Sequence, residues 1–148
     1  MNRQFCTFHV GDLFLGIEVN NVQEVLRGCE ITPVPAAPPE IRGLINLRGQ
    51  IVPAIDLRSR FGIDEGADGP FTVLVLATGT EPLSFVVDRA GDVVDVDEEN
   101  FEQPPDTLTG EPRRLIQGAH KLEDSLLLVL DLEHAVTIDI DGSGEKEQ

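Results

Sequence analysis

Hydrophobic and polar residues alternate along much of the chain, and this period of two is typical of half-buried β-strands. The clearest case is residues 5–19, FCTFHVGDLFLGIEV, where two alternating stretches flank a Gly-Asp pair at 11–12. Such a pair between alternating stretches predicts a tight hairpin. One face of its second strand would carry the apolar side chains Leu13, Leu15, Ile17 and Val19.

The pattern changes after this predicted hairpin. Residues 20–26, NNVQEVL, predict a short helical turn, because Asn20 is a good N-cap and Gln23 occupies the capping-box position three residues later. Four prolines between residues 33 and 39 then predict an extended loop. Pro39 favours the start of another brief helix through PPEIRGLI, residues 38–45.

Two further strands are predicted on either side of Arg48-Gly49, namely LINL at 44–47 and QIVPAIDL at 50–57. Because proline cannot donate a ladder hydrogen bond, we expect Pro53 at a sheet edge or a bulge. The glycine-rich polar stretch DEGADGP, residues 64–70, is the expected junction between two halves of the chain.

The second half repeats the order of the first. Residues 71–87, FTVLVLATGTEPLSFVV, again predict strand, turn and strand, and DRAGDVVDV follows where NNVQEVL stood. A shift of 75 places also sets IVPAIDL at 51–57 on LLLVLDL at 126–132. Two matches in the same order favour duplication over chance similarity between β segments. A shift of 68 pairs Leu15 with Leu83, Ile17 with Phe85, Val19 with Val87, Asn20 with Asp88, Glu24 with Asp92, and Val25 with Val93.

These elements predict a mainly β fold with a few short helices. Each half has about five short strands, which suits a small barrel better than a sandwich. Two such barrels would pack their apolar faces into one core. The expected domain spans residues 4–137, with approximate halves 4–66 and 70–137 between which strands could be exchanged, and with a polar flexible tail at 139–148.

Charge narrows the class of partners. The formal net charge of −16 and a pI near 4.3 argue against nucleic acids, whose phosphates need basic surfaces. The acidic run at 92–102 is interpreted as a solvated face, since it lacks the ligand spacing and central glycine of a calcium loop. No apolar run is long enough to span a membrane and no signal peptide is recognised, so cytoplasmic residence is the default expectation.

Residues that could carry chemistry are sparse. Cys6 and Cys29 have no CxxC spacing and are interpreted as reduced packing thiols. The three histidines share no ligand spacing, so neither zinc nor any other cofactor is expected. Motifs of nucleophile elbows, phosphate loops and zinc proteases are absent from the sequence. The chain is therefore interpreted as a binding module and not as an enzyme.

One basic segment contrasts with this acidity. Four of the nine arginines, which we call the arginine cluster, lie among residues 42–60, where Asp56 is the single acid. They are Arg42, Arg48, Arg58 and Arg60.

Several segments together carry a resemblance to a known family. They are FHVGDLFLGIEVNNVQEVL, ITPVPAAPPEIRGLINLRGQIVPAIDLRSRFG, FVVDRAGDVVDV and LLLVLDL, which follow one another over roughly residues 4–137. This combination resembles CheW, the coupling protein of bacterial and archaeal chemotaxis. The resemblance implies two pseudo-symmetric, SH3-like five-stranded barrels and no catalytic activity.

The resemblance also implies partners. CheW-like proteins join the cytoplasmic tip of chemoreceptors to the histidine kinase CheA, whose regulatory domain has the same fold. Copies of both build rings in the receptor array, so other copies of the chain are expected partners too. Three alternatives stay open: the same fold in a twitching, gliding or developmental pathway, an unrelated peptide-binding barrel, and an enzyme.

The family's motifs place the expected contacts in this sequence. By resemblance, the receptor-facing groove would use Val19, Val22, Glu24, Gly43, Asn46, Arg48, Gly49, Thr72 and Val73. The kinase would contact Leu44, Ile51, Ile55 and Leu57. A guanidinium on a rigid hairpin suits a carboxylate, so we expect Arg48 to pair with Glu24 at the groove edge. The chain lacks tyrosine, so the aromatic contacts of some relatives are not expected.

Overall fold

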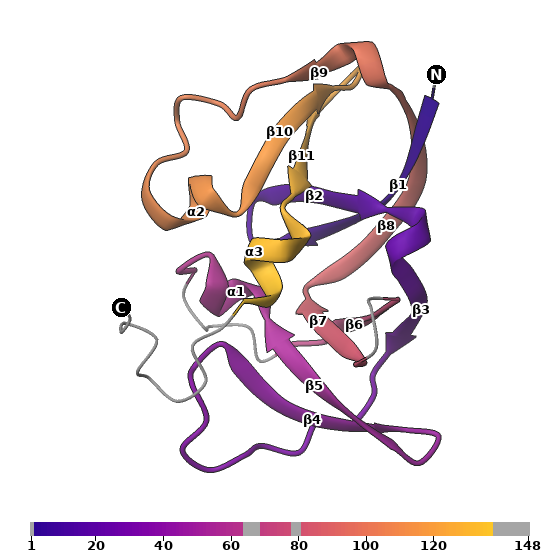
Figure 1. Ribbon diagram of the computed structural model, residues 1–148, viewed down its shortest axis with the longest axis vertical. Coiled ribbons are helices and arrows are strands. Elements are labelled where there is room, and N and C mark those ends of the chain that lie inside the picture. The colour runs from indigo at the N-terminus through magenta and orange to yellow at the C-terminus, as the bar shows by residue number, and fades with distance from the viewer. Residues whose placement is uncertain (1, 64–68, 78–80, 138–148) are drawn as a thin grey trace.

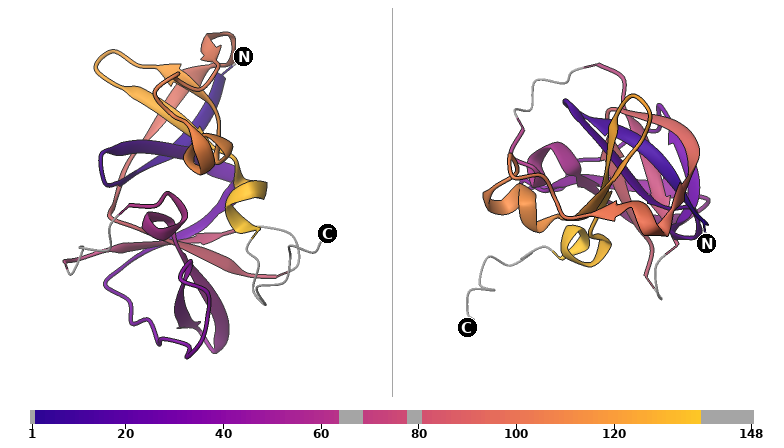
Figure 2. Two further views of the ribbon diagram at one scale, coloured as in Figure 1. Left: turned by 90° about the vertical axis from the view of Figure 1, so that its left-hand side faces the viewer. Right: turned by 90° about the horizontal axis from the view of Figure 1, so that it is seen from above.

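The computed structural model describes residues 2–63, 69–77 and 81–137, and these form two β-sheets with short helices at the level between them (Figures 1 and 2). The upper lobe in Figure 1 is a sheet with the strand order β8-β1-β2-β11-β10-β9. The lower lobe is a sheet with the order β3-β6-β7-β5-β4. The predicted mainly β fold is confirmed, although the short β9 makes the upper sheet six-stranded and not five-stranded.

The elements follow one another along the chain with these bounds. The strands of the upper lobe are β1 (Asn2–Val10), β2 (Leu13–Glu18), β8 (Arg89–Asp97), β9 (Phe101–Glu102), β10 (Ile116–Lys121) and β11 (Leu126–Leu130). Those of the lower lobe are β3 (Val22–Arg27), β4 (Ile41–Leu47), β5 (Gln50–Asp56), β6 (Thr72–Leu76) and β7 (Leu83–Val87). The helices are η1 (Val19–Asn21), α1 (Leu57–Arg60), η2 (Glu98–Asn100), α2 (Gly110–Arg114) and α3 (Leu132–Val136).

The four strands predicted on either side of the two tight turns are confirmed. The β1–β2 hairpin turns at Gly11-Asp12, with Val10 paired to Leu13 and Gly11 at a positive φ of 58°. The β4–β5 hairpin turns at Arg48-Gly49. The predicted junction at 64–70 lies mostly outside the described residues, and the predicted tail at 139–148 lies wholly outside them.

The two short helices predicted in the first half do not form over most of their predicted length. Residues 19–21 form a single 3-10 turn, and the chain then continues as β3, which pairs antiparallel with β6. Asn20 does not cap this turn, whose N-cap is Glu18. Pro39 likewise lies in a tight turn, in which the Ile41 amide donates to the Pro38 carbonyl at 2.9 Å before β4 begins. Pairing with distant strands overrides the local helical signals in both places.

Pro53 lies in an interior strand, not at an edge. The strand order sets β5 between β7 and β4, and Pro53 pairs with Leu44 of β4. The ladder between β5 and β7 begins only at the next residue, Ala54. The missing amide of Pro53 is therefore outside that ladder, which explains why proline is tolerated there.

Each sheet draws strands from both halves of the sequence. The β1–β2 hairpin from the first half lies between β8 and β11, both from the second half. The β6–β7 hairpin from the second half lies in the same way between β3 and β5. The internal repeat is thus visible as two equivalent hairpins that have exchanged partners, and neither half of the sequence forms a sheet system of its own.

Period-two alternation divides the buried side chains among three cores. Along β6, Leu74 and Leu76 face the core shared by both lobes, whereas Val73 and Val75 face a core inside the lower lobe. Along β11, Leu128 and Leu130 face the shared core, and the alternate residues face a third core inside the upper lobe. The shared core is built from both lobes, and this predicted feature is confirmed by residues such as Phe8, Leu15, Ile17, Ile55 and Phe85.

Candidate functional site

The β4–β5 turn presents Arg48 on a rigid support. Arg48 and Gly49 both have positive φ, 54° and 86°, which suits the two central positions of a tight hairpin turn. The Asn46 side-chain oxygen accepts from the Gly49 amide at 2.9 Å and holds the turn from the strand side. The Arg48 side chain is 69% exposed, so its guanidinium is accessible from solvent.

The predicted pair between Arg48 and Glu24 is confirmed. Arg48 donates through Nη1 and Nη2 to the two carboxylate oxygens of Glu24, at 2.5 and 2.9 Å. This bond lowers the pKa of Glu24 below its ordinary value and raises the pKa of Arg48. Glu24 comes from β3, one edge of the lower sheet, and Arg48 follows β4, the other edge. The ion pair therefore links the two edges, as expected for a sheet that curls toward a barrel.

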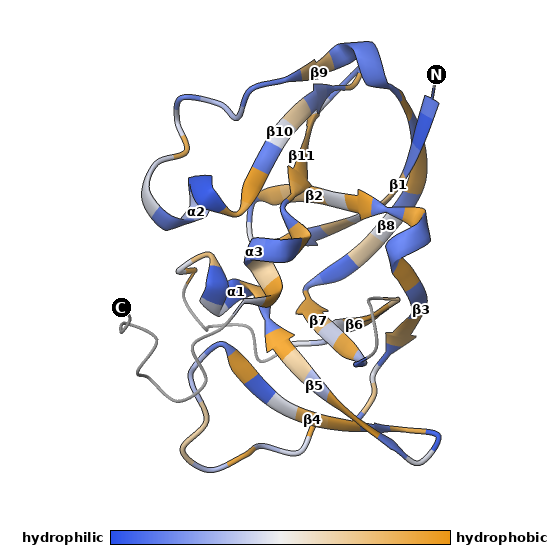
Figure 3. Ribbon diagram, viewed as in Figure 1, coloured by the Kyte–Doolittle hydropathy of each residue, from blue (hydrophilic) through white to orange (hydrophobic). Residues whose placement is uncertain are grey.

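The lower lobe also exposes aliphatic side chains. Ile51, paired with Asn46 across the hairpin, is 56% exposed, and Val25 and Val34 of the same lobe are also exposed. In Figure 3 hydrophobic and hydrophilic residues alternate along β4 and β5 up to the tip of the hairpin. A planar cation, its partner carboxylate and exposed aliphatic side chains are the groups that hold a partner protein in register.

A contact within the chain explains why position 43 is a glycine. A Cβ at this position would lie 2.3 Å from the backbone oxygen of Thr32. Thr32 and Leu44 form an isolated antiparallel bridge with two backbone hydrogen bonds of 2.8 Å. The close approach that the glycine allows is thus made by the chain itself, from the proline-rich loop.

Four of the expected contact residues are buried in the structure. Thr72 and Val73 lie inside β6 and are buried, and Val73 belongs to the core of the lower lobe. Ile55 and Leu57 are buried in the shared core. These four side chains cannot touch a partner in this conformation. Of the remaining expected residues, Val19, Val22 and Leu44 are half-buried.

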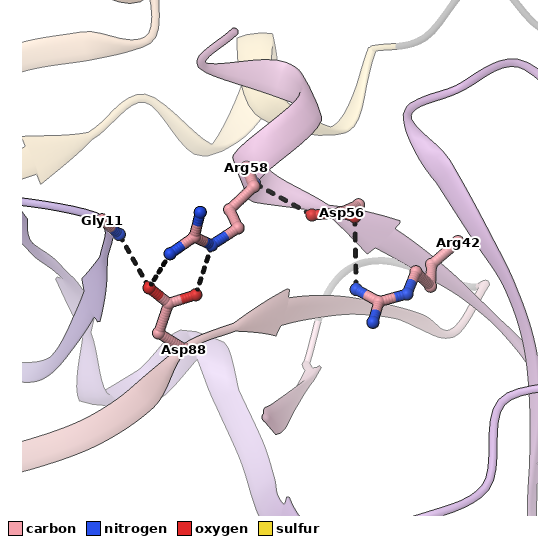
Figure 4. A network of polar contacts seen from close by, with 5 residues as sticks. All are labelled: Gly11, Arg42, Asp56, Arg58 and Asp88. Atoms are coloured by element: carbon pink, nitrogen blue, oxygen red, sulfur yellow. Dashed lines mark hydrogen bonds and ion pairs between the residues drawn. The ribbon is translucent and has the colours of Figure 1, made fainter. Parts of the chain in front are cut away.

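All four residues of the arginine cluster have partners within the chain, and the side chains of the other three are less exposed than that of Arg48. Arg42 pairs with the buried Asp56 at 3.2 Å, and its guanidinium also lies 5.3 Å from the ring centre of Phe71. Arg58 makes a two-pronged ion pair with Asp88 (Figure 4). Arg60 donates to the backbone oxygens of His134 and Ala135 at the end of α3. Arg48 therefore has the most exposed side chain of this cluster.

Asp56 and Asp88 are the residues that sequence reasoning left without a role. Asp56 caps α1, because its side chain accepts from the Arg58 amide at 3.0 Å. Asp131 caps α3 in the same way, so an aspartate directly after an apolar strand is a signal that could have been used. Asp88 is different, since its partners Arg58 and Gly11 are distant along the sequence and no local pattern connects them.

Hollows lie on two sides of the molecule. One, of about 240 Å³, is lined by polar residues around η1 and includes Val19, Asn20 and Glu18. Another, of about 340 Å³, is largely apolar and is bordered by the β1–β2 turn, α1 and α2. Val19 is the one expected receptor-facing residue that lines either of them.

Other functional classes find little support in the described residues. Within residues 2–63, 69–77 and 81–137 no three His, Cys, Asp or Glu side chains gather as metal ligands would. In the same part of the chain no helix is long and apolar enough to cross a bilayer. Cys6 and Cys29 are free and half-buried, as predicted, and burial raises the pKa of each thiol.

Two sheets around a shared core, with an exposed ion pair on the β4–β5 hairpin, suit a domain that binds other proteins. The family model described as CheW-like domain matches residues 4–138. The chain belongs to the CheW-like domain family, and the comparisons identify it as a chemotaxis adaptor.

Individual relatives agree with this family. The chain is 31% identical to "Chemotaxis protein CheW" of Treponema pallidum (strain Nichols), over 87% of this chain and 79% of that protein. It is 32% identical to the protein of the same name in Bacillus subtilis (strain 168), over 84% of this chain and 80% of that protein. It is 39% identical to "Protein FrzA" of Myxococcus xanthus, over 58% of this chain and 54% of that protein.

A solved structure matches as well. The crystal structure of scaffolding protein TtCheW from Thermoanaerobacter tengcongensis superposes with a TM-score of 0.84 at 28% identity, covering 94% of this chain and 95% of that one. A scaffolding protein with the same fold over nearly the full length agrees with the adaptor family.

Proposed function

We propose that the chain couples the cytoplasmic tips of chemoreceptors to the histidine kinase CheA in the cytoplasm, at receptor arrays on the inner face of the membrane. The observation that carries this proposal is the exposed, two-pronged Arg48–Glu24 pair on the rigid β4–β5 hairpin. The family membership and the scaffolding neighbour support it.

The receptor contact follows from the chemistry of this hairpin. An amphipathic receptor helix would lay its apolar stripe against the half-buried Val19 and Val22. Its carboxylates would accept from the remaining N–H groups of the Arg48 guanidinium, which Glu24 holds in a fixed geometry. Because the pair is exposed, its value lies in orientation and specificity more than in stability.

A double-mutant cycle on receptor binding tests this role. Arg48→Ala and Glu24→Ala are each expected to weaken binding of a receptor signalling tip roughly tenfold, and the double variant by less than the product of the two. Arg114→Ala is the matched control, because Arg114 is 70% exposed and also pairs with a glutamate, Glu111, but belongs to α2. Strictly additive effects would contradict the pairing role, and loss of fold by circular dichroism would assign Arg48 to structure.

The kinase contact is placed on a neighbouring surface. With Ile55 and Leu57 buried, Ile51 is the most exposed apolar residue that remains of the expected set, together with the half-buried Leu44. Ile51→Glu is expected to weaken binding of the CheA regulatory domain while the fold is retained. Val93→Glu provides the control, since Val93 is 54% exposed and lies in the other lobe. Equal loss in both variants would remove Ile51 from the interface.

Co-sedimentation with receptor-containing membranes tests the adaptor as a whole. The chain is expected to sediment with receptor membranes, and kinase to sediment fully only when the chain is added. The likeness to Protein FrzA, which is not named as a chemotaxis protein, favours a second pathway as the alternative. Binding to receptors of such a pathway, and none to chemotaxis receptors, would support that alternative.

A further inference from the structure

The chain passes between the two lobes at two equivalent places. It leaves the upper lobe through η1 after β2, and it returns at Asp88, the single residue between β7 and β8. The repeat aligns Asn20 of η1 with Asp88. A point where the chain changes sheets is where one lobe can rotate against the other, so the contacts at these two places decide how rigidly the lobes are held.

Asp88 ties both lobes together at the second crossing (Figure 4). Its carboxylate accepts from Nε and Nη2 of Arg58, each at 2.8 Å, and Arg58 belongs to α1 of the lower lobe. It also accepts from the Gly11 amide at 2.8 Å, and Gly11 is the turn of the upper-lobe hairpin β1–β2. The neighbouring Arg58 bond is the largest cause of the lowered pKa of Asp88, so this carboxylate stays charged.

A second contact runs from the same helix to the upper lobe. Arg60 donates from Nη2 to the His134 oxygen at 2.5 Å and from Nε to the Ala135 oxygen at 3.3 Å. The His134 oxygen also accepts from the Thr137 amide at 3.2 Å. Both carbonyls lie in the last turn of α3, where a cation interacts favourably with the partial negative charge of the helix end. Arg60 also pairs with Glu111 of α2 at 3.2 Å.

The repeat does not reproduce these contacts from the other side. The alignment of β5–α1 with β11–α3 keeps the capping aspartates, Asp56 and Asp131, but sets Glu133 and Ala135 at the places of Arg58 and Arg60. The crossing at η1 has Asn20 where the other has Asp88. Among the residues that the structure describes, the basic side chains shown to bond across the lobes thus come from α1.

We propose that α1 acts as a clasp, in which Arg58 and Arg60 are positioning residues that fix the angle between the lobes and so the shape of the partner-binding surface. The clasp comprises Arg58, Arg60, Asp88, Gly11 and the carbonyl end of α3. This inference rests on the proposed adaptor function for its purpose, but the geometry that it predicts can be measured without any partner.

Distances between spin labels measure that geometry directly. In a background of Cys6→Ser and Cys29→Ser, labels at Gln23→Cys in β3 and Lys121→Cys in β10 report the distance between the lobes from exposed strand positions. Labels at Gln23→Cys and Gln50→Cys report a distance within the lower lobe. The clasped protein is expected to give one narrow inter-lobe distribution.

Removing the clasp is expected to broaden the inter-lobe distribution alone. The test variant is Arg58→Gln with Arg60→Gln, and Asp88→Asn is the second. Arg42→Gln is the matched control, because Arg42 makes the same kind of ion pair with Asp56 but entirely inside the lower lobe. The control, and the distance within the lower lobe in every variant, should match the parent.

Two outcomes separate this inference from the proposed function. If the double variant folds and its inter-lobe distribution is unchanged, the clasp is overturned, whatever the chain binds. If the distribution broadens but the parent binds no receptor tip, the clasp stands and the adaptor proposal fails. Where the double variant does not fold, Arg58→Lys keeps the charge and loses the two-pronged geometry, and an unchanged distribution in that variant overturns the clasp equally.

Discussion

At the residue scale, the arginine cluster shows that one residue type serves two purposes within a short segment. Arg48 pairs with Glu24 at the exposed surface, whereas Arg42, Arg58 and Arg60 are less exposed and donate to carboxylates or backbone carbonyls. Arginine suits both tasks because its planar fork can pair with two acceptors at once. A count of charges along the sequence therefore overstates how much positive surface a partner would meet.

His120 is a buried residue whose ring has no partner among the described residues. It is 1% exposed and lies between the rings of Phe5 and Phe101, with centroid distances of 5.7 and 5.3 Å, while neither ring nitrogen has a hydrogen-bond partner within the described part of the chain. Burial lowers its pKa, the charge of Arg3 on β1 lowers it further, and Asp97 on β8 opposes both. The ring is thus held neutral, and protonating it in the fold is unfavourable.

The lowered pKa of His120 predicts how the stability of the fold changes with pH. Because the pKa is lowered in the folded state, the unfolded chain binds the proton first, and stability is lost as pH falls below about 6.5 toward the folded-state pKa. His120→Leu, of similar volume, should remove this loss and raise the free energy of unfolding at neutral pH by about 1 kcal/mol. Urea unfolding of both proteins between pH 7 and 5 measures it, with His134→Leu as the exposed control. Parallel profiles for parent and His120→Leu would contradict the prediction.

Gly43 gives a second prediction at this scale. Gly43→Ala would set a Cβ 2.3 Å from the Thr32 oxygen, so the backbone bridge to the proline-rich loop must move. We expect a loss of about 3 kcal/mol in the free energy of unfolding. Gly28→Ala is the control, because Gly28 has a positive φ of 68° but no neighbour within 4 Å of its added Cβ. Its expected loss is only about 1 kcal/mol, and equal losses in thermal or urea unfolding would show that contact with Thr32 is not the cause.

At the scale of elements, the two short helices α1 and α3 both begin with an N-capping aspartate, but the two aspartates have different further partners. Asp56 accepts from the Arg58 amide and pairs with Arg42, and it is buried. Asp131 accepts from the His134 amide and contacts the His134 ring, and it is half-buried. A four- or five-residue helix has little stability of its own, so each depends on its cap and on packing.

The comparison of the two caps is a direct test. Asp131→Ala should cost about 1 kcal/mol, the usual effect of losing an N-cap. Asp56→Ala should cost about 2 kcal/mol, because it also leaves the Arg42 guanidinium without its carboxylate. Urea unfolding with circular dichroism measures both. Arg42→Gln in the Asp56→Ala background should then add little, and a full additional loss would show that Arg42 contributes through contacts other than Asp56.

Elements with a strong period of two could be predicted from the sequence, whereas those defined by distant partners could not. Both hairpins could be located because alternating apolar residues flank a turn pair, and the apolar side of each strand enters a core. The strand β3 was misread because Asn20 and Gln23 suit a helix start, and only pairing with β6 makes it a strand. The pair of Arg48 and Glu24 was predicted from side-chain chemistry, but the role of Asp88 depends on Gly11, 77 positions away.

At the scale of the whole molecule, the exchange of hairpins makes the two lobes depend on each other. The lower sheet needs β6–β7 from the second half to connect β3 with β5, and the upper sheet needs β1–β2 from the first half to connect β8 with β11. The shared core also takes buried side chains from both lobes. Contacts between residues far apart in sequence therefore dominate, which favours one cooperative unfolding transition over two separate ones.

Cutting the chain between residues 66 and 67 tests this dependence. Each fragment lacks the hairpin that would lie at the centre of its sheet, so neither fragment alone should show strand-type circular dichroism or a cooperative unfolding transition. Mixed in equal amounts, the fragments should regain both, because the exchanged hairpins can then restore the two ladders β3–β6 and β1–β8. The intact chain provides the reference, and a mixture of the first fragment with a second fragment carrying Phe85→Asp, which places a charge in the shared core, should not fold. Cooperative unfolding of either fragment by itself would contradict the interdependence of the lobes.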